Sequence, residues 1–456
     1  MNKGIAGKFL WKITYSTLLI FIHHCCCHPE LVEGSVPLRE PQCDSAFNYY
    51  GYLFLLLFIR MIFNKFSLKC HEYEKFWGYA KSITKLLTIR IAHWNYIQEF
   101  NMIKKSVFGK EIYEYSGVIH VHTEHSFDGH RSLADIVHTA EDHNVDFICI
   151  TDHRSLEVKN DISAILQSKL NILIGYEMND AEMNNHYLVF NIDEVFPLSM
   201  SADEYVKETH KLGGIGFIAH PFERRRSKRT LRTYNWTSWN TSVFDGIEIW
   251  NYISEWTDKL RIPWNVIPKI LFPNTSIKKP KKEVLKKWDE LNNKGMKKAG
   301  IGSVDSHENR YSVGPFSISF LPHRKLFGTI RTNIQTRQPL SSNDPTQEIL
   351  SLLKNGNSYI VNYLHADPHM FYCGIESKSS EKFALPGEEI SLEEKDLYLF
   401  IYFQQDCHIK IIHNGNIVHT EYMNKVSFPI TEKGFYRIEV FIGLKGWLFT
   451  NPIYVV

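Results

Sequence analysis

The chain has 456 residues, of which 44% are hydrophobic, 22% charged and 14% aromatic. This globular composition excludes disorder, collagen-like repeats and coiled coil as the main architecture, and the length favours two or three domains. The formal net charge of +2 (52 Lys and Arg against 50 Asp and Glu) removes the global electrostatic argument for a nucleic-acid coat or a polybasic membrane binder. The 22 histidines make metal chemistry the first hypothesis to test.

The first 106 residues differ in character from the rest of the chain. Two apolar stretches, Phe9–Ile22 and Phe47–Phe63, each fall short of the roughly 20 clean apolar residues that a membrane-spanning helix needs. Lysines precede the first stretch and follow the second, so the positive-inside rule would put both ends of this prefix in the cytoplasm. A membrane anchor and a buried or amphipathic helical prefix both fit. We expect the protein in the cytoplasm or at the cytoplasmic face of a membrane.

From Gly117 onward, apolar runs alternate with helical patterns. The expected strands cover 117–122, 146–151, 172–175, 186–192, 215–219, 246–250 and 299–304, and the expected helices cover 133–140, 162–170 and 202–212. This alternation predicts an α/β fold with a parallel sheet, either open or closed into a barrel. In such folds the chemistry lies at the carboxyl ends of the strands.

Histidine and carboxylate side chains mark six of these expected strand ends. In chain order they are His120 and His122, then Asp152 and His153, then Glu177, His186, His220, and finally Asp305 and His307. His120 and His122 are two residues apart, and the period of a strand would turn both imidazoles to one face. A single histidine is more often a core or surface residue, but this repetition predicts a metal centre.

The residue types indicate which ions such a centre would hold. Imidazole and carboxylate suit zinc, manganese or iron(II), and the sequence has no CxxC pair for a structural zinc site. The side chains outnumber the needs of one ion, so we expect two or three divalent ions. Ions a few ångströms apart can bridge a hydroxide and hold a phosphate, and no protein nucleophile is then required. The absence of GxSxG and Walker A motifs agrees with this.

These residues resemble the PHP (polymerase and histidinol phosphatase) superfamily over roughly 115–310. The matching stretches are His120-Val-His122 with Ser126-Phe-Asp128-Gly129, Ile150-Thr-Asp152-His153, Gly175-Tyr-Glu177, His186, Ala219-His220-Pro221 and Asp305-Ser-His307. The resemblance implies a distorted seven-stranded β/α barrel, (β/α)7, with a centre of two or three metal ions.

The resemblance also implies a distribution of ligands among the ions. One ion would take His120, His122, Glu177 and Asp305, a second would share Glu177 and add His186 and His220, and a third would take Asp128, His153 and His307. His125 is an alternative to Asp128, and His186 is alternatively a solvent-facing histidine at a strand end. Asp152 is expected to orient a ligand instead of binding metal. Asp152 and Glu177 are the candidate catalytic residues.

The chain beyond the metal motifs suggests a second module. Gly246–Asn251 and Ile349–Tyr363 resemble a branch of the family that includes phosphoesterases and carbamate-ester hydrolases and often adds a C-terminal β module. Residues 365–456 alternate in the manner of strands, with turns at Asn414-Gly415 and Lys433-Gly434. We therefore expect a prefix at 1–106, a metallohydrolase domain at 107–364 and a β-sandwich-like module at 365–456.

Two basic runs remain. Arg224, Arg225 and Arg226 follow His220-Pro221 and are candidates for binding substrate phosphate, with a solvated loop as the alternative. Lys278–Lys287 fits the exposed face of a helix better than a nucleic-acid patch, and no duplex nucleic acid is expected as a partner.

The favoured function is a metal-dependent phosphoesterase that acts on a small phosphorylated substrate, either a phosphomonoester or a short nucleotide. A carbamate, ester or amide hydrolase on the same scaffold is an alternative, because the ions could polarise a carbonyl instead. A membrane-tethered module that binds without catalysis is another, although the complete ligand set weighs against it.

Overall fold

The computed structural model describes residues 103–107, 110–224, 232–258, 260, 269–270, 272–313, 316–341 and 343–456. The chain divides into two compact units, 1–45 and 46–456, and all described residues belong to the second. Both apolar stretches of the prefix lie outside the described residues. Within the described ranges, no helix combines the length and the apolar character needed to cross a membrane.

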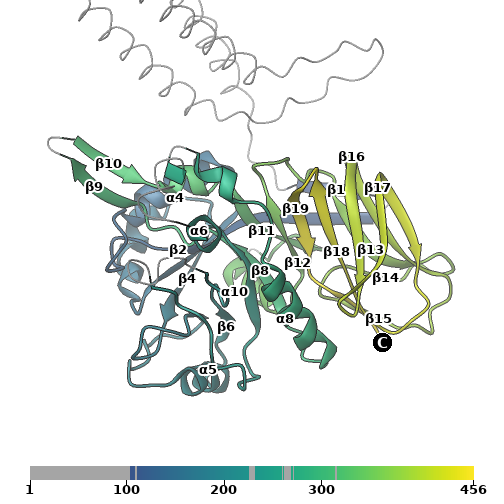
Figure 1. Cartoon of the computed structure of the whole chain (residues 1–456), viewed down its shortest axis with the longest axis horizontal. Coiled ribbons are helices and arrows are strands. Elements are labelled where there is room, and N and C mark those ends of the chain that lie inside the picture. The colour runs from purple at the N-terminus through teal and green to yellow at the C-terminus, as the bar shows by residue number, and fades with distance from the viewer. Residues whose placement is uncertain are drawn as a thin grey trace, which may run out of the picture. The chain divides into compact units, whose positions relative to one another are not determined.

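The first part of the described chain alternates strands with short helices (Figure 1). Its elements are β1 (Ile103–Val107), β2 (Lys110–Val121), α4 (Leu133–Asp142), β3 (Phe147–His153), the 3₁₀ helix η1 (Glu157–Ile165), β4 (Asn171–Met178), β5 (Tyr187–Phe190), α5 (Ala202–Lys211), β6 (Ile215–Ile218), β7 (Gly246–Asn251), α6 (Tyr252–Thr257), the 3₁₀ helix η2 (Pro273–Ser276), α8 (Lys282–Asn293) and β8 (Ala299–Ser303). The expected α/β alternation is confirmed.

Helix α4 forms where its sequence predicts it. Ser132 caps it by accepting a hydrogen bond from the backbone N–H of Asp135, and Leu133, Ile136 and Ala140 bury one face. The helix expected at 162–170 is instead the 3₁₀ helix η1. Its only buried residue is Val158, and Ile162 is 41% exposed, so η1 has no apolar face that would stabilise a full α-helix.

Strands β2 to β8 pair in sequence order. β2–β3, β3–β4, β6–β7 and β7–β8 are parallel, whereas β5 is antiparallel to both β4 and β6. The expectation of a parallel series is therefore wrong for β5. The reason is the connection from Met178 to Tyr187, which is too short for the crossover that a parallel neighbour requires and returns the chain as a hairpin instead.

β2 and β8, the first and last strands of this series, approach each other but do not pair through a regular ladder of hydrogen bonds. The N–H of Val304 donates to the carbonyl of Ile119, the N–H of Ser306 to that of His120, and Val121 and Ser306 form an isolated parallel bridge. Beyond this bridge, the ladders of the described strands join β2 to β1, β3 and β11, and β8 to β7. The described structure is therefore an α/β fold with a large mixed sheet that remains open between β2 and β8.

The second part of the chain is dominated by antiparallel strands (Figure 1). Its elements are β9 (Asn309–Val313), β10 (Phe316–Phe320), α9 (His323–Leu326), β11 (Ile330–Thr336), α10 (Pro345–Asn355), β12 (Ser358–Asn362), β13 (Tyr372–Ser377), β14 (Phe383–Ala384), β15 (Glu389–Ile390), β16 (Leu397–His413), β17 (Asn416–Pro429), β18 (Gly434–Ile442), β19 (Lys445–Thr450) and β20 (Ile453–Val455).

The turn predicted between β16 and β17 is present. Asn414 and Gly415 take φ values of 49° and 82°, the pair of left-handed conformations that a two-residue hairpin turn uses. The C-terminal strands do not form a separate sheet, because β19 pairs with β12, β12 with β11, and β11 with β2. The C-terminal strands and the strands that carry the histidines thus belong to one hydrogen-bonded sheet.

A buried ion pair joins the C-terminal strands to helix α8. The Arg437 side chain on β18 donates from Nε and Nη2 to the two carboxylate oxygens of Asp289, at 2.8 and 2.7 Å. Asn451 adds hydrogen bonds in both directions with the backbone of Gly300, at 2.7 and 2.9 Å. Because Asp289 is buried, the loss of Arg437 would leave its carboxylate without this compensation.

We expect Arg437→Gln to lower the free energy of unfolding by about 3–5 kcal/mol, because the buried Asp289 carboxylate loses the guanidinium that neutralises it. Lys207→Gln, which breaks the exposed pair with Asp203 at 2.5 Å, should cost no more than about 0.5 kcal/mol. Urea unfolding of both variants, followed by tryptophan fluorescence, measures the difference. Equal and small shifts of the two midpoints would show that the Arg437 pair does not stabilise the fold.

Candidate metal centre

The histidine and carboxylate side chains predicted from the strand ends come together at one edge of the sheet. We call His120, His122, Asp128, His153, Glu177, His186, His220, Asp305 and His307 the ligand cluster. His186 precedes β5, and because β5 is antiparallel its start lies at the edge where its neighbours end. The reversed strand therefore explains how a residue that opens a strand joins residues that close the others.

His120 and His122 meet through a bulge and not through regular strand geometry. The register between β2 and β3 shifts between Ile119 and Val121, and His120 has a φ of 66°. The two imidazole centroids lie 5.0 Å apart, and both side chains are fully buried. The predicted proximity is present, but the period-2 argument for it is wrong.

Left-handed backbone recurs within the cluster. Besides His120, His220 has a φ of 27° and Asp305 a φ of 55°. Such conformations are costly for residues other than glycine and persist where surrounding contacts enforce them. Here the N–H of His220 donates to Glu248 Oε2 at 2.6 Å, and the carbonyl of His120 accepts from the N–H of Ser306 at 3.1 Å.

Glu177 lies at the centre of the cluster and is only 1% exposed. Its Oε1 is 2.6 Å from His186 Nδ1 and 3.2 Å from His220 Nε2. Its Oε2 is 3.1 Å from His153 Nδ1, 3.2 Å from His120 Nε2 and 3.5 Å from His122 Nε2. One carboxylate therefore contacts imidazoles from five positions of the described chain.

Asp128 brings a second carboxylate to the other side of His153. Its Oδ2 lies 3.4 Å from His153 Nε2 and 3.3 Å from His307 Nε2. The preceding loop turns so closely that a Cβ on Gly129 would lie 1.9 Å from the carbonyl oxygen of Thr123, so only glycine fits there. His125, the alternative to Asp128, instead contacts Asp161 at 2.7 Å.

Several buried polar atoms of the cluster have no hydrogen-bond partner. They are Nε2 of His120, His122 and His186, Nδ1 of His153 and His220, and Oε2 of Glu177. Buried polar atoms are normally satisfied by protein, water or an ion. Sets of donor atoms close enough to share an ion are His122, Asp128, His153 and His307; His120, His122 and Glu177; His120, His220 and Asp305; and His153, Glu177 and His186. The residues therefore fit divalent metal ions.

The charges in the cluster also favour cations. Burial alone would raise the pKa of Glu177, but His153, His120 and His186 lower it well below its ordinary value. Burial alone would lower the pKa of His120, but the Asp305, Glu177 and Glu248 carboxylates raise it well above its ordinary value. The carboxylates are thus ionised and attract positive charge to the imidazoles. This charge is carried either by protons or by metal ions, which compete for the same ring nitrogens.

Burial and the neighbouring cations act differently on the outer histidines. Burial, together with the charge of His307, lowers the pKa of His122 to about 3, so its imidazole is neutral and can offer a lone pair. Burial would lower the pKa of His307 too, but its contact with Asp128 raises that pKa to about 9. The cluster therefore contains both a neutral imidazole, at His122, and a protonated one, at His307.

Glu248 on β7 belongs to this site, although it was not among the residues predicted from the sequence. Its Oε1 contacts His120 Nδ1 at 2.7 Å, and its Oε2 accepts from the N–H of His220. Asn251 links Glu248 to Asp305 through hydrogen bonds of 3.0 and 3.3 Å. The signal was available in the apolar run of β7, where Glu248 is the one acidic residue of GIEIWN.

The remaining residues predicted from the sequence are Asp152 and the two basic runs. Asp152 is buried and accepts from Thr123 N–H at 2.5 Å and Thr123 Oγ1 at 2.7 Å, so it fixes the start of the loop that carries Asp128. Arg224 pairs with Glu283 on α8 and lies exposed. Arg225 and Arg226 lie outside the described residues. The second basic run forms part of α8 and the segment before it.

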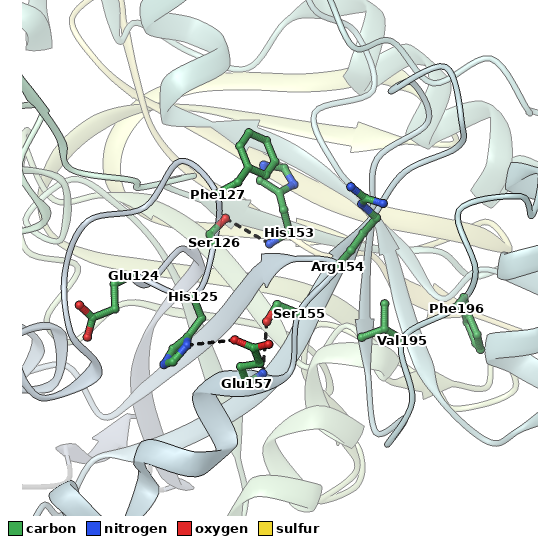
Figure 2. A pocket seen from close by; sticks show the side chains of 10 residues that line it. All are labelled: Glu124, His125, Ser126, Phe127, His153, Arg154, Ser155, Glu157, Val195 and Phe196. Carbon is green, nitrogen blue, oxygen red and sulfur yellow. Dashed lines mark hydrogen bonds and ion pairs between the residues drawn. The ribbon is translucent and has the colours of Figure 1, made fainter.

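A cavity of about 530 Å³ opens beside His153. Figure 2 shows Arg154, Val195 and Phe196 on one side of it and Glu124, His125 and Glu157 on the other, with Ser126, Phe127, His153 and Ser155 between them. Because His153 contacts both Glu177 and Asp128, the cavity gives access to the ligand cluster from solvent.

Comparison with solved structures gives weak similarities. A two-domain protein of Bacteroides vulgatus that contains a predicted PHP-like metal-dependent phosphoesterase is 15% identical, with 78% of this chain and 99% of that chain covered and a TM-score of 0.40. Endonuclease Q, solved with a duplex that carries an abasic lesion, is 13% identical over 54% of this chain and 58% of its own, with a TM-score of 0.31. Similarity at this level transfers no substrate to this chain.

The comparison with curated proteins gave no match. The family comparison is specific, however: the model of the PHP domain matches residues 119–245. This range begins beside His120 and includes His122, Glu177 and His220 of the ligand cluster, and it confirms the resemblance drawn from the motifs. Residues 119–245 of this chain are a PHP domain.

Proposed function

We propose that the protein is a metal-dependent phosphoesterase that hydrolyses a phosphomonoester or a short nucleotide. The observation that carries the proposal is the ligand cluster itself, in which unpartnered imidazole nitrogens face buried ionised carboxylates beneath a cavity open to solvent. Bound divalent ions would supply charge for the phosphoryl group and activate water as the nucleophile. The PHP domain supports this class of chemistry.

The proposed distribution of ligands is the one that the family resemblance implies, and His220 also belongs to a candidate set with His120 and Asp305. The first ion would take His120, His122, Glu177 and Asp305, the second Glu177, His186 and His220, and the third Asp128, His153 and His307. His120 with His122 and Glu177, and Asp128 with His153 and His307, each lie within one candidate set. His153 also approaches Glu177 and His186, so this histidine lies between two proposed ions.

The surrounding side chains would hold these ligands in place. The Glu248 carboxylate fixes the orientation of His120 and, by accepting from the backbone N–H of His220, the position of His220. Asp152 anchors Thr123, and Ser126 Oγ donates to Asp128 Oδ1 at 2.8 Å. Such outer contacts tune both the orientation and the basicity of the ligands. We also propose that β2 to β8 form the distorted barrel, which the hydrogen bonds near Val304 and Ser306 support.

Chelation should abolish hydrolysis, and added manganese or zinc should restore it, because the cluster offers no nucleophile of its own. Hydrolysis of p-nitrophenyl phosphate, bis(p-nitrophenyl) phosphate and p-nitrophenyl acetate before and after chelation measures this. Metal content is followed by elemental analysis. Unchanged turnover of the phosphate esters by verified metal-free protein would overturn the proposal, and turnover of the acetate alone would favour the carbonyl-hydrolase alternative.

Glu177→Gln should reduce bound metal by more than one equivalent, because the neutral amide removes the charge shared by the proposed ions. Asp152→Asn, the same change of carboxylate to amide, should keep the metal and lose about 10–100-fold in activity, because it acts through Thr123. Metal content and turnover of both purified variants distinguish the two roles. Equal metal content would contradict the assignment of Glu177 as a ligand and Asp152 as a positioning residue.

Glu248→Gln should weaken metal binding by about 10–100-fold, because His120 loses the carboxylate that orients its ring. Glu290→Gln on the exposed part of α8 is the control and should leave metal affinity in place. Competition with a metal chelator of known affinity measures both variants. If the two variants retain metal equally well, Glu248 does not support the site.

A further inference from the structure

We propose that the cavity beside His153 binds the organic part of the substrate, with Arg154 holding the phosphate and Phe127 stacking on a planar ring. This inference rests on the proposed function and narrows it to phosphate esters that carry a nucleobase or a similar aromatic group. The residues concerned lie outside the ligand cluster and contribute nothing to its metal-binding atoms.

The Arg154 side chain lines the cavity beside the ligand cluster, and its guanidinium is free to bind an anion there. It follows His153 directly, and its N–H donates to the carbonyl of Glu177 at 3.0 Å, which fixes its backbone behind the cluster. Its φ of 45° is a left-handed conformation that a non-glycine residue adopts only where its surroundings enforce it. Figure 2 shows its side chain on the Val195 side of the cavity.

The guanidinium of Arg154 lacks a carboxylate partner of the kind that Arg131 and Arg224 have. Its Nε is buried without a hydrogen-bond partner, and in the described part of the chain no ion pair involves this side chain. By contrast, Arg131 contacts Glu308 at 2.6 Å, and Arg224 pairs with Glu283. A planar guanidinium with unused donors binds phosphate oxygens well. Arg154 is therefore better placed for substrate phosphate than Arg224.

Phe127 offers an aromatic surface beside the same position. Its ring stacks on the His153 ring at 4.8 Å between centroids and 24° between planes, yet the residue is 69% exposed. Part of the ring is therefore accessible to a planar ligand that enters the cavity. Aromatic side chains of this kind are the usual stacking partners of nucleobases.

The charges of the cavity favour one orientation of the substrate. Glu124 and Glu157 lie on the side opposite Arg154 (Figure 2) and would repel an anion there. His125 contacts Glu157 at 3.6 Å as well as Asp161, so the acidic side is already engaged with a histidine. The phosphate therefore belongs near Arg154 and His153. The volume of about 530 Å³ suits a molecule of mononucleotide size.

Two phosphonates that cannot be hydrolysed test both contacts separately. Phenylphosphonate carries a ring and ethylphosphonate does not, while their anionic groups are the same. Calorimetric titration of the metal-loaded full chain should give about fivefold or tighter binding of phenylphosphonate, the low end of what stacking on an aromatic side chain contributes. Arg154→Gln should weaken both phosphonates at least about tenfold, because a charged hydrogen bond is lost.

Phe127→Leu should weaken phenylphosphonate to the affinity of ethylphosphonate and leave ethylphosphonate within about twofold, since only the ring contact is removed. Arg154→Lys should recover part of the affinity lost in Arg154→Gln, because it restores the charge without the planar fork. Lys159→Gln, paired with Asp193 at 2.9 Å, and Tyr422→Leu, an exposed aromatic on β17, are matched controls that should bind both probes like the wild type.

Wild-type affinity of Arg154→Gln for both probes would overturn the phosphate contact. Equal loss of both probes, or of neither, in Phe127→Leu would overturn the ring contact. Such results from a protein that still hydrolyses phosphate esters in a chelator-sensitive way would leave the proposed function in place. A wild-type protein that holds metal but binds neither phosphonate and cleaves no phosphate ester would refute both.

Discussion

The buried carboxylate of Glu177 is the constraint on which the site depends. An ionised carboxylate at 1% exposure is strongly destabilising unless positive charge and hydrogen-bond donors surround it. Imidazoles from five positions supply these contacts, within 2.6 to 3.5 Å of its oxygens. Because those imidazoles are themselves buried, they need the carboxylates to hold a charge. Neither set is stable in this place without the other, and a divalent cation satisfies both at once.

This mutual dependence explains why the sheet departs from regular geometry at its edge. A strictly parallel series would place the start of β5, and with it His186, at the opposite edge from Glu177. A regular β2 would not hold His120 at a φ of 66°, and regular backbone would not hold His220 or Asp305 either. Hydrogen bonds within the site hold these strained conformations in place. For example, the Glu248 carboxylate accepts from the N–H of His220. Each of the strands β2 to β8 thus contributes a side chain that contacts this centre, either from within the strand, just beyond its end or, for β5, just before its start.

The sequence was sufficient for the identity of the cluster but not for its geometry. His120, Glu177 and Asp305 could be predicted because polar side chains at the ends of apolar runs are conspicuous. The direction of β5 could not, because hydrophobic periodicity is the same in parallel and antiparallel strands. The bulge at His120 depends on pairing with β3, which no local pattern reports. The orienting role of Glu248 was hidden because its partners are 128 and 28 residues away in the chain.

The balance of charge also shows why a phosphate substrate needs a group outside the cluster. Within the cluster, each carboxylate is already matched by imidazoles that share its protons or metal ions, as the lowered pKa of Glu177 and the raised pKa of His307 show. Of the nearby arginines, Arg131 and Arg224 form ion pairs with Glu308 and Glu283, respectively. Arg154 does not, and its backbone is fixed to Glu177 through a hydrogen bond of 3.0 Å. The same strand end that carries the metal-type ligand His153 therefore also presents the uncompensated positive charge, and this places recognition of the anion one residue away from the chemistry.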